Sequence, residues 1–204
     1  MTRLILVRHA VTTENHSNRF WGITDLKLSE AGLRQAELLH DRLAKEHLDA
    51  IYCSKLTRSR KTAEIIAAGH ELPLYETPEL NECNFGDAEG LTFDEINVRF
   101  PDLLQVLLGT DTSTRFPDGE SLEDVFQRTG SFIHRLQEHG MNETVCIVGH
   151  GTPLQTIICH LLGLSAGFWH RFRIDRASLS TIETYEGGAT LTRLNDTGHL
   201  NGVN

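Results

Sequence analysis

The chain has 204 residues, of which 39% are hydrophobic and 23% are charged, the proportions of a soluble globular protein. Lys and Arg number 19 against 28 Asp and Glu, so the net charge of −9 argues against nucleic acid or an anionic membrane as the main partner. No apolar run approaches the roughly 18 residues that a membrane-spanning helix needs. The sequence therefore predicts one domain over residues 1–204, located in the cytoplasm.

The cysteine and histidine spacings bear on redox state and metals. None of the four cysteines (Cys53, Cys83, Cys146 and Cys159) belongs to a CxxC pair, and three of the four lie in apolar or strand-like segments. We expect reduced, buried thiols rather than disulfides or a metal cluster. His9 and His150 could ligate a metal, but no HxxxH or HxH pattern and no carboxylate at ligand spacing accompanies them. The sequence thus predicts neither a metal nor a cofactor.

The first half of the chain alternates apolar runs with helical patterns. Residues 2–7 predict a short buried strand, and Ser29 fits the N-cap of a helix whose apolar face carries Leu33, Ala36 and Leu39. Further along, the pattern predicts a strand at 49–53, a helix at 58–68 and an edge strand at 72–75, where Pro73 cannot donate to a sheet.

The second half continues this alternation. Helical patterns occur at 93–98, 103–108 and 122–138, and a central strand at 144–148 leads into a helix at 153–162. Two runs, 179–185 and 189–194, predict a β-hairpin. The irregular stretch 109–120 predicts a surface loop near the functional site described below. The pattern therefore indicates an α/β fold, a three-layer αβα arrangement with a mostly parallel sheet and an antiparallel edge strand.

Two of the predicted strands end in a histidine. Arg8-His9 follows the first apolar run, and Gly149-His150-Gly151 follows the run at 145–148. The C-terminal ends of strands in an open α/β sheet are where ligands bind, so both imidazoles could share one crevice. Arg8 suits an anion such as phosphate, and the amide of Asn15 in the next turn could bind its oxygen atoms.

Two further segments carry candidate chemistry. Arg58 lies in the first turn of a predicted helix, where its positive charge is repelled by the positive end of the helix dipole. A bound anion there would offset this repulsion. A solvated basic face is the alternative. Glu82 lies between Leu80 and Phe85, so a partly apolar wall could favour its protonated form and a general-acid role. Here the alternative is a simple turn.

In order and spacing, these motifs resemble the histidine phosphatase (phosphoglycerate mutase-like) superfamily over about residues 2–195. The resemblance is carried by Arg8-His9 with Thr12 and Asn15, Ser54-x-Leu56-x-Arg58 with Thr62-Ala63, Glu82 before Phe85-Gly86-x-x-Glu89-Gly90, and Gly149-His150-Gly151. One such motif is a weak signal, but four in order are highly specific. The positions that depart from the family pattern are Ala10, Val11 and Ala88.

The resemblance implies a metal-independent phosphomonoesterase that works through a phosphohistidine. His9 would attack phosphorus. Glu82 would protonate the leaving oxygen and then deprotonate the hydrolytic water. The remaining groups would hold the phosphoryl oxygens or lie at the pocket mouth: Arg8, Arg58, His150, Asn15 and Gly151 at the oxygens, and Trp21 and Gly22 at the mouth.

The resemblance leaves the reaction and the substrate open. The segment over the site, residues 89–120, is shorter than in cofactor-dependent phosphoglycerate mutases, so a phosphatase is favoured over a mutase. Three segments (116–121, 175–178 and 194–200) are similar to bacterial metal-independent phosphoserine phosphatases and α-ribazole phosphatases. The predicted partner is thus a small phosphate ester, with phosphoserine and α-ribazole phosphate as candidates.

Two other classes of function compete with a phosphatase. A catalytically silent phosphate-binding relative would not need the complete set of motifs. A dinucleotide-binding enzyme is disfavoured because no GxGxxG follows the first strand. The hairpin at 179–194 could pair with the edge of a second copy, which makes a homodimer a further candidate.

Overall fold

A six-stranded sheet forms the centre of the computed structural model, which describes residues 1–14, 19–109 and 111–201. The strands are β1 (Thr2–Arg8), β2 (Ala50–Cys53), β3 (Leu74–Glu76), β4 (Thr144–Gly149), β5 (Leu179–Tyr185) and β6 (Gly188–Asp196). The α-helices are α1 (Glu30–Leu43), α2 (Thr57–Ala67), α3 (Phe93–Arg99), α4 (Leu104–Leu107), α5 (Leu122–Leu136) and α6 (Gly151–Leu161). Short 3-10 helices include η2 (Pro78–Leu80) and η5 (Ala166–Arg171).

The strand order is β3-β2-β4-β1-β5-β6, with β1 and β4 in the middle. Strands β1 to β4 are parallel, whereas β5 runs antiparallel to β1 and β6 antiparallel to β5. The predicted α/β class and mixed sheet are confirmed, with one refinement. The strand that runs antiparallel to β1 is β5, and it is not the edge strand. The edge strand is β6, because both strands of the predicted hairpin add to the sheet beside β1.

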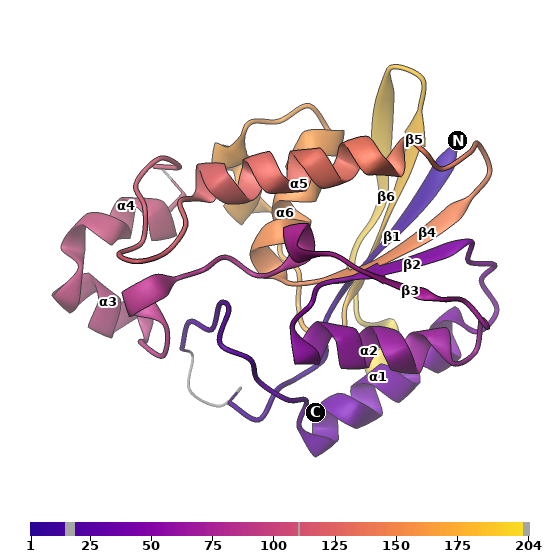
Figure 1. Ribbon diagram of the computed structural model, residues 1–204, viewed down its shortest axis with the longest axis horizontal. Coiled ribbons are helices and arrows are strands. Elements are labelled where there is room, and N and C mark those ends of the chain that lie inside the picture. The colour runs from indigo at the N-terminus through magenta and orange to yellow at the C-terminus, as the bar shows by residue number, and fades with distance from the viewer. Residues whose placement is uncertain (15–18, 110, 202–204) are drawn as a thin grey trace.

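Helices cover both faces of the sheet (Figure 1). On one face α1 and α2 pack on the strands, and on the other α5 and α6 do. Alternation along β1 explains this, since Ile5 and Val7 face the first layer while Leu4 and Leu6 face the second. A parallel strand buried on both faces must be apolar throughout, which is why the sequence shows an unbroken run here.

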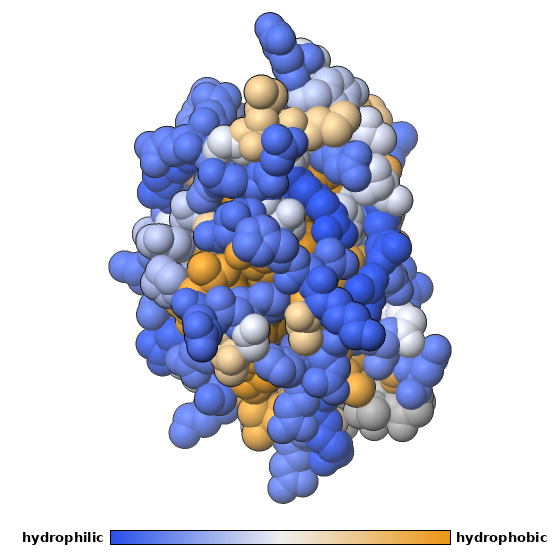
Figure 2. Space-filling view, turned by 90° about the vertical axis from the view of Figure 1, so that its right-hand side faces the viewer, coloured by the Kyte–Doolittle hydropathy of each residue, from blue (hydrophilic) through white to orange (hydrophobic). Residues whose placement is uncertain are grey.

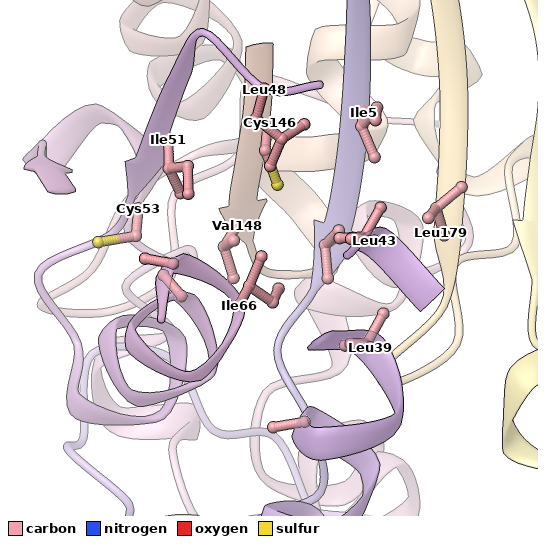
Figure 3. Packing of buried hydrophobic residues seen from close by; sticks show 14 of the residues in the cluster. Ile5, Leu39, Leu43, Leu48, Ile51, Cys53, Ile66, Cys146, Val148 and Leu179 are labelled. Carbon is pink, nitrogen blue, oxygen red and sulfur yellow. The ribbon is translucent and has the colours of Figure 1, made fainter. Parts of the chain in front are cut away.

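The first of these two cores lies between α1, α2 and the sheet (Figure 3). Leu39 and Leu43 of α1 and Ile66 of α2 point toward strand residues such as Val148. Helix α1 begins as predicted, because the Ser29 side chain accepts a hydrogen bond from the N–H of Gly32 at 3.0 Å.

A third, smaller core lies outside these layers. Helices α3 and α4 lie beyond the start of α5, away from the sheet (Figure 1). Their buried residues Ile96 and Val106 pack with Phe116, which is 3% exposed and anchors the irregular stretch that precedes α5. The segment between Cys83 and α5 therefore forms a separate apolar unit beside the main sheet.

The side that carries the N-terminus is mostly hydrophilic, with apolar atoms showing between the polar ones (Figure 2). Strand β1 begins on this side, so its C-terminal end, and that of the parallel strand β4, point away from it toward the middle of the molecule. Among the described residues no helix is long and apolar enough to cross a membrane. The homodimer through the hairpin edge stays a prediction.

Candidate active site

Strand register brings the two histidines together. Arg8 in β1 pairs with Gly149 in β4, so the next residue of each strand, His9 and His150, leaves the sheet at the same level. The N–H of His9 donates to the Gly149 carbonyl at 2.9 Å, and the ring centroids lie 4.9 Å apart. Both rings are buried, and they meet at the C-terminal ends of β1 and β4, where the crevice was expected.

Hydrogen bonding fixes which nitrogen of the His9 ring is unprotonated. Its Nδ1 lies 2.8 Å from the Ala10 carbonyl, which can only accept, so Nδ1 carries the proton and Nε2 does not. Burial above all, then His150, Arg176 and Arg58, holds the pKa of His9 well below its ordinary value. The ring is therefore neutral, with an unprotonated Nε2 available as a nucleophile.

In the His150 ring, Nε2 is hydrogen-bonded and Nδ1 has no partner among the described residues. Its Nε2 lies 2.6 Å from Oγ of Ser54, the residue that follows β2. That hydroxyl oxygen also accepts from the N–H of Leu56 at 3.3 Å, and we assign its proton to the bond with Nε2. Nδ1 of His150 then carries a proton, and it is buried without a partner among the described residues. Burial and the nearby Arg58 hold the pKa of His150 well below its ordinary value.

Two arginines from the sequence motifs join the histidines. Arg58, in the first turn of α2, is 2% exposed and donates to the carbonyls of Thr24 at 2.8 Å and Gly22 at 2.5 Å. Arg8 donates from Nη1 to the Ile174 carbonyl at 2.6 Å, while its Nε is buried with no partner in the part of the chain that the structure describes. The solvated basic face considered for Arg58 is thus wrong.

Glu82 belongs to the same cluster and is 6% exposed. Its Oε2 accepts from the N–H of Gly151 at 3.0 Å, and its Oε1 accepts from those of Thr152 at 3.2 Å and Cys83 at 2.9 Å. The expectation of an apolar wall is wrong for these oxygen atoms, because the free N–H groups at the start of α6 attract a carboxylate. In this structure the Gly151 N–H assigned to phosphate is bonded to Glu82. Helix α6 also begins two residues before the predicted start, at Gly151.

Arg176 is a site residue that the sequence analysis did not single out. Its Nη1 lies 3.4 Å from Nε2 of His9, and burial together with Arg8 and Arg58 lowers its pKa to about 9. The N–H of Ala177 fixes this turn by donating to the carbonyls of Arg8 at 3.1 Å and His9 at 3.2 Å. A single basic residue in a loop has no periodic signal, so only the likeness of residues 175–178 to known phosphatases pointed to this turn.

Three guanidinium groups are concentrated in this cluster. Burial lowers the pKa of Arg8, Arg58 and Arg176, and Glu82 is the acid whose attraction opposes that shift in all three. Asp175 also attracts Arg8, and Asp25 and Glu89 also attract Arg58, so Glu82 is the acid common to all three guanidinium groups. Buried cations are stable where counter-charges pair with them, so the arrangement fits a dianion.

A cavity of about 360 Å³ adjoins this cluster, and Arg8, Glu82 and Arg176 contribute to its lining. Gly151 has no side chain, which leaves space between Arg8 and Glu82. A Cβ at this position would lie 3.5 Å from Cζ of Arg8 and 3.6 Å from Oε2 of Glu82. A ligand group of similar size can therefore reach both side chains.

The remaining predicted residues have different positions. Trp21 lines the cavity, as expected for a residue at its mouth. Gly22 does not line it, because its carbonyl faces Arg58 and a Cβ there would lie 2.1 Å from the Cys83 carbonyl oxygen. Asn15 lies outside the described residues.

Potential metal ligands and cysteines occur throughout the described residues 1–14, 19–109 and 111–201. Within those ranges no group of three or more His, Cys, Asp or Glu side chains is arranged to hold a metal ion. All four cysteines lie in these ranges and are buried and free, as predicted.

Comparison with known proteins identifies the family of the chain. The family model of the histidine phosphatase superfamily (branch 1) matches residues 4–197. The chain belongs to this family.

Similar proteins include enzymes named for two substrates. The chain is 35% identical to phosphoserine phosphatase 1 of Hydrogenobacter thermophilus over 98% of this chain and 95% of the relative. It is 34% identical to the adenosylcobalamin/alpha-ribazole phosphatase of Salmonella typhimurium, over 95% and 96%. The crystal structure of the alpha-ribazole phosphatase from Shigella flexneri superposes with a TM-score of 0.85 at 32% identity, covering 95% of this chain and 96% of that one.

Proposed function

We propose that the protein is a phosphomonoesterase that hydrolyses a small phosphate ester through a phosphohistidine at His9. The observation that carries the proposal is a pair of buried donor atoms without partners among the described residues, Nε of Arg8 and Nδ1 of His150, in a cluster with a neutral His9. A buried donor left unpaired costs about 1–3 kcal/mol. The oxygen atoms of a bound phosphoryl group would accept from both.

In the first step, a bond forms between Nε2 of His9 and phosphorus while the bond between phosphorus and the ester oxygen breaks. The leaving alkoxide takes a proton from the Glu82 carboxyl group. Arg8, Arg58 and His150 hold the charge on the phosphoryl oxygens as the transfer proceeds.

In the second step, water attacks phosphorus and gives its proton to the Glu82 carboxylate. The bond between phosphorus and Nε2 of His9 breaks, which releases inorganic phosphate and restores the neutral imidazole. Two displacements of moderate barrier replace one difficult hydrolysis. The guanidinium groups supply the positive charge that a metal ion supplies in other phosphatases, so we propose a metal-independent reaction.

We further propose that residues 1–204 act as one domain and that the reaction takes place in the cytoplasm. A single sheet supports the first proposal, since its β1, β2 and β4 are followed by His9, Ser54 and His150 respectively. Four free, buried thiols suit a reducing compartment and support the second. The names of the relatives make phosphoserine and α-ribazole phosphate the first substrates to examine.

The test is hydrolysis of p-nitrophenyl phosphate with a metal chelator present. We expect release of inorganic phosphate without any added phosphoryl acceptor, and acid-labile phosphate on the rapidly quenched enzyme. His9→Ala should abolish the label and reduce turnover by about 10⁴-fold or more. His47→Ala is the control, because this side chain is 86% exposed and should leave both unchanged.

The competing functions predict other results. A mutase would transfer the phosphoryl group to an acceptor and release little phosphate alone. A silent phosphate-binding relative would bind vanadate without turning over any ester. Turnover that survives in His9→Ala would overturn the proposed role of this histidine.

A further inference from the structure

The cavity beside the phosphoryl-binding cluster is mainly apolar. Six of its aromatic and aliphatic lining side chains are Trp21, Phe85, Leu107, Phe116, Leu122 and Trp169. They come from the segment at residues 19–21, from the third apolar core, from the start of α5 and from η5. Segments distant in the sequence thus form one apolar wall next to the charged cluster.

The lining also holds polar groups, because Nε1 of Trp21 and Nε1 of Trp169 are buried without a partner among the described residues, and Thr152 and Gln155 contribute as well. The charged side chains, by contrast, offer little to a cationic leaving group. Among the described lining residues they are Arg8, Arg19, Glu82 and Arg176, and all but Arg19 belong to the phosphoryl-binding cluster. Arg19 already donates to Glu95 at 2.7 Å and to the Gly90 carbonyl at 2.6 Å. A leaving group with its own ammonium would find no described carboxylate here except the one that the reaction uses.

The apolar wall is held in place by its own packing. The ring of Phe85 makes edge-to-face contacts with Phe20 at 5.4 Å and with Phe116 at 5.1 Å. Phe116 is 3% exposed and packs in the third core with Val106. A wall fixed in this way presents a preformed surface, and preformed apolar cavities of a few hundred Å³ are typical small-molecule sites.

We infer that the alcohol part of the substrate is an extended apolar or aromatic group that packs against this wall while its phosphate is bound by the basic cluster. The inference rests on the proposed function, because it assigns the leaving group of that reaction. Each CH₂ buried against the wall multiplies binding about fourfold. Small polar esters such as phosphoserine fill little of this space and are poor substrates.

A series of n-alkyl phosphates tests this inference. Ethyl, butyl and hexyl phosphate share the same type of leaving alkoxide, so the chemical step is constant and only burial changes. We expect kcat/KM to rise roughly a hundredfold or more from ethyl to hexyl phosphate. Phosphoserine should be a poorer substrate than hexyl phosphate.

Two neighbouring leucines at the end of α4 give a matched pair of variants. Leu107 lines the cavity, whereas Leu108 does not and is 50% exposed. Leu107→Ala should lower kcat/KM for hexyl phosphate about tenfold and change that for ethyl phosphate by less than about twofold. Leu108→Ala should change neither.

The outcomes separate this inference from the proposed function. Equal kcat/KM values along the series, or a preference for phosphoserine over hexyl phosphate, would overturn the inference while the phosphatase stands. Calorimetric binding of ethylphosphonate and hexylphosphonate measures the same difference without turnover. Should no ester be hydrolysed, tighter binding of hexylphosphonate would still support the apolar wall, and equal binding would remove it.

Discussion

The turns that follow β1 and β4 have the same position in the sheet but differ in chemistry. Both strands deliver a buried histidine at the same register. His9 uses Nδ1 to donate to the carbonyl of Ala10, so its Nε2 is unprotonated and accepts from Arg176, whereas His150 uses Nε2 to bond to Ser54 and its Nδ1 has no partner among the described residues. Opposite ring nitrogens thus remain for a ligand, one able to attack and one able to donate.

The difference lies in the partners rather than in the rings. A backbone carbonyl accepts only, so it fixes the proton on His9 in one place. The hydroxyl of Ser54 comes from another strand end, and only the pairing of β2 with β4 brings it to His150. Equivalent positions in a sheet therefore do not imply equivalent roles.

Replacing each histidine in turn should give the largest effects and the clearest difference. In His9→Asn we expect no acid-labile phosphate and a loss of turnover of about 10⁴-fold or more. In His150→Asn the nucleophile remains while one donor to phosphate is lost, so turnover should fall about 10²- to 10³-fold with labelling retained. Rapid-quench labelling measures both, and loss of the label in both variants would contradict the division of roles.

Arg176 donates to Nε2 of His9, whereas Nδ1 of His150 has no partner among the described residues. We expect Arg176→Ala to lower kcat/KM for p-nitrophenyl phosphate about 10²-fold through weaker phosphoryl binding. Arg176→Lys should recover only part, since an ammonium cannot make a forked contact. Arg34→Ala, on an exposed position of α1, is the control, and an equal small effect in both would exclude Arg176 from the site.

Ser54 is a positioning residue for His150, and its removal should have a smaller effect. Ser54→Ala leaves Nε2 of His150 unpaired and allows both neutral forms of the ring. We expect about a tenfold loss in kcat with little change in KM. Ring ¹⁵N shifts should change from the Nδ1–H form to a mixture, and Ser54→Thr should restore them. Unchanged shifts in Ser54→Ala would show that another group fixes the ring.

The smallest effect is on stability, where the two histidines should act alike. Their folded-state pKa values lie well below the ordinary value of 6.5, so below that pH the unfolded chain binds more protons. Stability should therefore fall as the pH decreases from about 6.5 to 5, by up to about 1.4 kcal/mol per pH unit for each histidine. Urea unfolding at pH 7 and 5 measures this dependence. His9→Asn should reduce the pH dependence of the unfolding free energy by the contribution of one histidine, and His47→Gln should leave it unchanged. An identical pH dependence in the wild type and both variants would contradict a lowered pKa at His9.

Local patterns were sufficient to predict most of the architecture. The apolar runs that became β1 and β4 are buried on both faces, and such runs require helices on each side. The N-cap at Ser29 and the hairpin at β5–β6 were also readable, because capping and turn preferences depend on neighbouring residues alone.

Only the tertiary structure determined how the site groups meet. The N–H donors around Glu82 come from the start of α6, and Arg176 reaches His9 from the turn before β5. These contacts join residues far apart in the chain, whose meeting depends on strand order and register. The sequence by itself thus determined which chemical groups are present and at which strand ends they lie. The fold decided which atom of each group is free, because a hydrogen-bond partner acts across space and leaves no pattern in the chain.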